Sequence, residues 1–216
     1  MELFMRVFVR YQTAAMIVLG LFVSPFLQAK SVALSSPDGK IEVLVNDDKG
    51  IPTYQLTYNK QILIENSPLG LLFAHSPSIS EGFALSNTQT SSVDQTWTQP
   101  WGERKFVRDN HRELNVEWKR PGKEGARFSV RFRVFNDGIG FRYEVPKQGS
   151  ATELSITDEL TEFRIAGSDK VTAWWIPSRG WNRYEYNYNT TPLREVDRAH
   201  TPFTFKTGAG VHMSIH

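Results

Sequence analysis

The chain has 216 residues, with 25 basic and 23 acidic side chains and a formal net charge of +2. A charge so close to balance gives no electrostatic basis for binding nucleic acid. The absence of cysteine excludes disulfide bonds and thiolate metal sites, so the stability of the protein must come from a hydrophobic core.

Residues 1–29 have the order of a secretory signal peptide. Two arginines precede an apolar run over residues 14–23, and the small residue Ala29 follows. The apolar run is short for a bilayer span, which favours a cleaved leader over a retained membrane anchor. We therefore expect an exported protein whose mature chain begins at Lys30 and is free of the membrane.

After the leader, the dominant pattern is the short alternation of apolar and polar residues that is typical of β-strands. Its clearest examples are "KIEVLVN", "TYQLTYN", "ELNVEW" and "RFSVRFRVF", which are bounded by turn residues such as "DDKG" and "PGKEG". A looser polar stretch over residues 76–92 lacks the pattern. The sequence predicts an all-β domain of many antiparallel strands, arranged as two large packed sheets.

The clearest hairpin covers residues 127–145. Alternation in its first strand separates two sets of side chains, and Asn136-Asp137-Gly138 supplies the turn. One predicted face carries the apolar residues Phe128, Val130, Phe132 and Val134, and the other carries Ser129, Arg131 and Arg133.

Two later segments need interpretation. "SITDELTEF", residues 155–163, allows a short helix capped by Thr157 or a strand. We favour the strand, because residues 160–165 continue a period of two into β-rich surroundings. Residues 211–216 alternate in the same way up to the last residue, so we expect the sequence to be a truncated piece of a longer protein.

Common catalytic and metal-binding motifs are absent from the sequence. The five histidines form no H-E-x-x-H pattern, and His212 and His216 would share one face of a strand without forming a chelate. There is no G-x-S-x-G and no phosphate-binding loop. Carboxylate pairs stay open as an alternative, because any two acids can meet in space.

Three blocks of sequence together resemble a known family. They are "PWGERKFVRDNHREL" (100–114), "FRVFNDGIGFRYEVP" (132–146) and "WWIPSRGWNRYEYNYNTTPL" (174–193). In this order and spacing they are similar to the N-terminal domain of glycoside hydrolase family 97, and the resemblance extends over residues 32–216.

The resemblance implies a fold and a function. The fold is an antiparallel β-supersandwich, a two-sheet sandwich like that of galactose mutarotase. In the family it precedes a (β/α)₈ barrel in an exported, calcium-dependent α-glucosidase or α-galactosidase of bacteria, so we expect a periplasmic or secreted protein. The general acid and the base or nucleophile lie on the barrel, so we expect no catalytic residue in residues 30–216 and no hydrolysis of glycosides by this domain alone.

The aromatic segment 174–188 has two interpretations. In the first, Trp174, Trp175 and Ile176 end a strand and fill the core, and three tyrosines alternate on one side of the next strand. In the second, Glu185 on the opposite side of that strand is the carboxylate that this domain contributes to the calcium ion of the barrel. Glu195 is the alternative ligand.

Other assignments remain as alternatives. Trp101, Glu103 and Arg104 either line a sugar site or pin a turn through a salt bridge and a buried ring, and we favour the pinned turn. For the whole domain, one rival function is a stand-alone carbohydrate-binding module whose sugar platform is the aromatic segment. A second rival is a structural sandwich that docks to a partner protein.

Overall fold

The computed structural model describes residues 30–122, 126–147, 153–180 and 182–216. These residues form antiparallel strands with only two short 3₁₀ turns, which confirms the predicted all-β class. The predicted leader, residues 1–29, lies outside the described residues. In the part that is described, no helix has the length and apolarity needed to cross a membrane.

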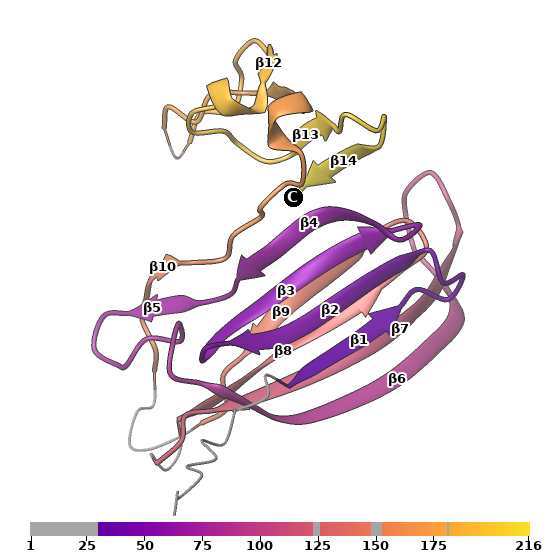
Figure 1. Ribbon diagram of the computed structural model, residues 1–216. Coiled ribbons are helices and arrows are strands. Elements are labelled where there is room, and N and C mark those ends of the chain that lie inside the picture. Colours follow the sequence, from indigo (N-terminus) through magenta and orange to yellow (C-terminus); the bar gives the residue numbers. More distant parts are fainter. Residues whose placement is uncertain (1–29, 123–125, 148–152, 181) are drawn as a thin grey trace, which may run out of the picture.

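Two four-stranded antiparallel sheets pack face to face as a sandwich (Figure 1). The strands of the first sheet follow the order of the chain: β1 (Ser31–Ser35), β2 (Ile41–Asp48), β3 (Ile51–Tyr58) and β4 (Gln61–Pro68). Those of the second sheet do so as well: β6 (Ala84–Thr98), β7 (Phe106–Lys119), β8 (Arg127–Val134) and β9 (Ile139–Glu144).

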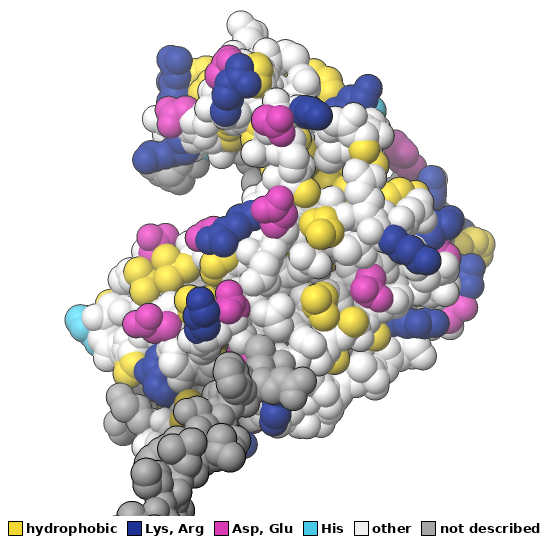
Figure 2. Space-filling model, viewed as in Figure 1, with side chains coloured by type: hydrophobic (Ala, Val, Ile, Leu, Met, Phe, Trp, Pro, Cys, Tyr) yellow, Lys and Arg dark blue, Asp and Glu magenta, His cyan; other side chains and the backbone are white. Residues whose placement is uncertain are grey.

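A smaller sheet lies beyond β4, at the top of Figure 1, and in the same view the molecular surface is notched between this sheet and the sandwich (Figure 2). Its strand order is β12-β11-β13-β14, so β12 lies at one edge and β11 lies between β12 and β13. The strands are β11 (Thr172–Trp175), β12 (Asn189–Pro192), β13 (Phe203–Lys206) and β14 (His212–Ile215), and the 3₁₀ turns are η1 (Ser168–Lys170) and η2 (Leu193–Glu195).

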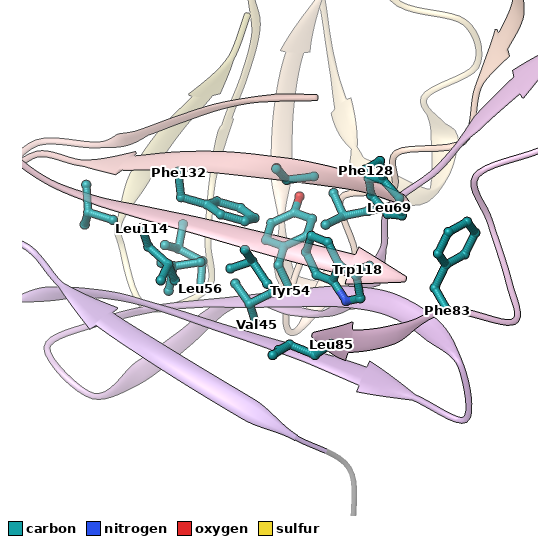
Figure 3. Close-up of a cluster of buried hydrophobic side chains, with 14 of the residues drawn as sticks. Val45, Tyr54, Leu56, Leu69, Phe83, Leu85, Leu114, Trp118, Phe128 and Phe132 are labelled. Atoms are coloured by element: carbon teal, nitrogen blue, oxygen red, sulfur yellow. The ribbon is translucent and has the colours of Figure 1, made fainter. Parts of the chain in front are cut away.

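The sandwich core is aromatic (Figure 3). Trp118 of β7 and Phe128 of β8 stack with their ring centroids 5.1 Å apart, and both are almost completely buried. Tyr54 of β3 reaches across to Phe132, with 6.3 Å between centroids. Burial of these rings supplies the main driving force for folding in a chain that has no disulfides.

The predicted hairpin is confirmed. Its four apolar side chains are at most 1% exposed, and β8 pairs with β9 over Ser129–Val134. On the opposite face, Arg131 donates to carboxylate oxygens of Glu113 and Glu144. The alternation therefore assigned both faces correctly.

The segment predicted to be a strand near residue 160 is partly one. Ile156–Glu159 forms β10, which pairs with β5 (Leu71–Phe73). The chain then continues beside β4: Leu160 N–H donates to Gly70 C=O at 2.9 Å, and Glu162 N–H donates to Pro68 C=O at 3.0 Å. Residues 160–165 thus cover the edge of β4, and only Ile165 forms a bridge there.

The expectation of a loose stretch over residues 76–92 was wrong from Ala84 onward. Residues 84–92 are the first part of β6, which at 15 residues is the longest strand described. Most of its side chains are exposed on both faces, so it lacks the alternation that marks a half-buried strand.

Candidate functional site

The aromatic segment becomes a long connection between β11 and β12 in the small sheet. The root of this connection is fixed to residues 198–200. Ser178 N–H donates to Arg198 C=O at 2.8 Å, and His200 N–H donates to Ile176 C=O at 2.9 Å. We call residues 177–188 the β11–β12 loop. These two backbone hydrogen bonds fix where the loop starts.

The two tryptophans of β11 point to opposite faces of the small sheet. Trp175 is 6% exposed and donates from Nε1 to the hydroxyl of Thr191 at 3.1 Å. Trp174 is half-buried on the other face, where its ring lies parallel to that of His212 with 6.0 Å between centroids. The prediction that Trp175 and Ile176 fill the core is confirmed, but Trp174 does not belong to it.

The predicted strand over residues 184–188 is absent. Tyr186 N–H donates to Tyr184 C=O, two residues earlier, at 3.0 Å. This tight turn prevents the extended backbone that alternation requires, and regular pairing begins only at Asn189. Tyr184 and Tyr188 are 45% and 57% exposed. The interpretation that places Glu185 on a strand, opposite three alternating tyrosines, is therefore wrong.

Contacts of aromatic rings, and not strand hydrogen bonds, hold the loop. The Tyr184 ring lies 5.5 Å from the ring of His200, and the Arg179 guanidinium lies 5.8 Å from the centroid of Tyr186. Desolvation, followed by the neighbouring Tyr188, raises the pKa of Tyr184 above its ordinary value. His200 Nε2 is shielded from solvent and has no hydrogen-bond partner among the described residues.

Glu185 lies between these two ring contacts with its side chain exposed. Within the described chain its carboxylate has no hydrogen-bond or ion-pair partner. Glu195 in η2 is exposed as well, but its Oε1 lies 3.5 Å from Nη2 of Arg194. Glu185 is thus the freer of the two candidate carboxylates.

The structure brings no complete metal site together. Among the residues it describes, no group of three or more His, Asp or Glu side chains is close enough to hold a metal ion. Calcium takes about six to eight oxygen ligands. Glu185 can therefore be at most one member of a ligand set completed elsewhere.

The pinned turn predicted for "WGERK" was wrong. This run lies in the β6–β7 tip, residues 99–105, and Trp101 is 82% exposed there. Neither Glu103 nor Arg104 forms a salt bridge in the described residues. The tip is held instead by Gln99, whose backbone N–H donates to Lys105 C=O at 3.1 Å and whose side chain donates to Arg104 C=O.

One pair of chemically competent side chains was missed. His111 Nδ1 lies 2.6 Å from Asp109 Oδ1, and the imidazole is 1% exposed beside Phe135. The spacing of two on a strand places both side chains on one face, which is the signal that could have found them. The buried imidazole has no access to solvent, so the pair is a structural contact.

A hollow of about 440 Å³ lies beside β4 and β10, away from the β11–β12 loop. Its lining includes the apolar residues Leu69 and Leu160 and three carboxylates, Glu81, Glu159 and Glu162. One of these carboxylates is paired with a cation, because Arg164 Nε lies 2.7 Å from Glu162 Oε2.

The chain is similar in sequence and structure to known proteins. The family model described as "Glycosyl-hydrolase 97 N-terminal" matches residues 34–216. A glycoside hydrolase family 97 enzyme from Pseudoalteromonas sp. strain K8, solved with panose and also with acarbose, is 48% identical with a TM-score of 0.82. The match covers 86% of this chain and 28% of that enzyme.

Two curated relatives are also similar to this chain. A retaining α-galactosidase of Bacteroides thetaiotaomicron is 24% identical over 88% of this chain and 29% of its own length. A probable retaining α-galactosidase of Streptomyces bingchenggensis is 30% identical over 60% of this chain and 19% of its own length. The chain thus spans less than a third of each relative.

Proposed function

Because the chain belongs to the family of N-terminal domains of glycosyl hydrolase family 97, we propose that it is the non-catalytic β-sandwich domain of an exported, calcium-dependent α-glycosidase. In this proposal the domain packs on a (β/α)₈ barrel and completes one side of its sugar-binding site. The family membership carries the proposal, and the catalytic carboxylates belong to the barrel.

Within this function, Glu185 is proposed as the ligand that the domain contributes to calcium. Three observations support it: the carboxylate is exposed, it has no partner in the described chain, and ring contacts on both sides hold its loop. A ligand that already formed an ion pair would lose that contact on binding, which for an exposed pair costs about 0–1 kcal/mol. Glu195, beside Arg194, carries this small cost.

The ion would have two roles when the barrel supplies the remaining oxygens. It would link the domain to the barrel, and its charge would orient the sugar and stabilise developing negative charge on the leaving oxygen. The substrate class that fits is an α-linked glucoside or galactoside, since relatives are described as α-galactosidases or were solved with panose and acarbose.

The experiment is a chimera in which this chain replaces the matching 28% of the Pseudoalteromonas enzyme. We expect the chimera to hydrolyse an aryl α-glycoside in the presence of calcium and the 216-residue chain alone to show no turnover. Calcium-stimulated turnover by the chain alone would contradict the assignment of catalysis to the barrel. A folded but inactive chimera would contradict the proposed packing.

A carbohydrate-binding module is the second candidate, and the exposed rings of Tyr184 and Tyr188 favour it. Exposed aromatic rings can pack on sugar C–H faces without any barrel. Calorimetry of the chain alone with maltooligosaccharides separates the two functions. Binding that Tyr188→Ala abolishes supports the module, whereas the domain function predicts no binding.

A further inference from the structure

One side of β6 has no partner in the described structure. β6 is an edge strand: it is the first in the sheet order β6-β7-β8-β9, and it pairs only with β7. Figure 1 shows it along the border of the sandwich with no other strand beside it. An unpaired edge presents a row of backbone donors and acceptors that can accept another strand.

The register identifies the backbone groups that face outward. In an antiparallel pair, opposite residues alternate between bonding to each other and pointing their N–H and C=O groups away. Gln99 N–H bonds to Lys105 C=O, and the next pair is Thr98 with Phe106. The backbone N–H and C=O groups of every second residue, counted back from Thr98, therefore point away from β7. These residues are Thr88, Thr90, Ser92, Asp94, Thr96 and Thr98.

This edge lacks the usual protection against pairing. Natural edge strands carry lysine, proline or bulges that prevent association. From Asn87 to Thr98 the strand has no lysine and no proline, and its bulge lies outside this stretch, between Leu85 and Asn87. The single charge, Asp94, is neutralised by Arg108, whose Nη2 lies 2.7 Å from its Oδ2.

We propose that the chain forms a dimer in which β6 pairs antiparallel with β6 of a second copy, joining two four-stranded sheets into one. A two-fold axis makes such a contact self-complementary. Centred on Ser92, the pairing places Thr90 opposite the partner's Asp94. A centre at Asp94 would oppose two carboxylates, which is destabilising.

The part of β6 beyond β8 gives this pairing a structural purpose. Pairing of β7 with β8 begins at Arg112, so Val93–Thr98 and Phe106–His111 form a two-stranded ribbon with no third strand among the described residues. A two-stranded ribbon is marginally stable in water. In the dimer, Thr96 lies opposite the partner's Thr88, so each ribbon gains a third strand.

Sedimentation equilibrium of the secreted, processed chain tests the proposal. We expect the mass to rise from that of one chain to that of two over the micromolar range. Ser92→Pro removes an outward N–H without removing a bond to β7, and Thr90→Lys adds a charge at the pairing edge. Both variants are expected to stay monomeric with an unchanged far-UV circular dichroism spectrum.

The matched control is Thr190→Lys, the same substitution on the four-residue edge strand β12. It is expected to dimerise like the unmodified chain. Hydrogen exchange gives a second readout, since the outward amides of Thr88–Thr98 become protected only in the dimer. A chain that stays monomeric throughout, or a dimer that neither edge variant weakens, overturns the proposal.

Discussion

Arg131 holds Glu144 through two parallel hydrogen bonds, Nε to Oε1 at 2.8 Å and Nη2 to Oε2 at 3.1 Å. This bidentate contact joins β8 to β9 on the face opposite the core. The hydrogen bond from Arg131, opposed in part by desolvation, lowers the pKa of Glu144 from 4.5 to about 2. The contact therefore ties the stability of the outer face to pH.

The Glu144 contact predicts acid sensitivity. A carboxyl group whose pKa is lower in the folded state stabilises the fold above its unfolded pKa, and that stability is lost as the pH falls from about 4.5 towards about 2. We expect Glu144→Gln to be less stable than the unmodified chain at pH 7 and to lose less stability between pH 5 and 2. Urea unfolding at a series of pH values measures this, and parallel pH profiles would contradict it.

Gly70 lies where a side chain has no room. A Cβ added there would be 2.6 Å from the carbonyl oxygen of Ile79. The backbone N–H of Gly70 donates to the hydroxyl of Tyr143 at 2.8 Å. We expect Gly70→Ala to lower the free energy of unfolding by about 1–3 kcal/mol, as overpacking does. Gly140→Ala is the control, because no atom lies within 4 Å of its added Cβ. Equal midpoints in urea would refute the prediction.

The hydrogen bond between Trp175 and Thr191 joins β11 to β12 at the base of the β11–β12 loop. Thr191→Val leaves the buried indole N–H without its acceptor, so we expect a loss of about 1–3 kcal/mol of unfolding free energy. Thr190→Val, one residue earlier and on the opposite face, is expected to change stability little. Guanidinium unfolding followed by tryptophan fluorescence compares the two variants, and equal effects would argue against this bond.

Trp101 and Trp118 are expected to respond oppositely to truncation. Trp118 is fully buried against Phe128, so Trp118→Ala is expected to cost about 3–5 kcal/mol or to prevent folding. Trp101, at 82% exposed, is expected to tolerate alanine within about 0.5 kcal/mol. A large loss of stability on Trp101→Ala, measured by thermal unfolding, would contradict the exposed position of Trp101 and support a buried ring that pins the turn.

The sequence predicted those strands that have one buried face. β2, β3, β7 and β8 place apolar side chains in the core at every second position, and this period is visible in the sequence. β6 was missed because its polar side chains face solvent on both sides, and its position is set by pairing with β7. Pairing to a neighbour leaves no periodic signal.

The candidate site was less predictable than the fold. The alternation of Tyr184, Tyr186 and Tyr188 is typical of a strand, but the backbone forms a tight turn there. Tyr184 contacts His200, which is distant in sequence, and Tyr186 contacts Arg179 on the other side of the loop. Trp101 was expected to be a buried ring that pins a turn, yet it is 82% exposed in the β6–β7 tip. In both places tertiary context overrides local pattern.

The most direct test of the proposed function is the calcium dependence of Glu185→Gln in the chimera with the Pseudoalteromonas enzyme. We expect this variant to fold normally but to lose calcium affinity and turnover together, because the amide removes a charged ligand while keeping its size. Glu195→Gln, the matched substitution, is predicted to keep both. Unchanged calcium dependence in Glu185→Gln, together with its loss in Glu195→Gln, would contradict the role of Glu185 and assign the ligand to Glu195.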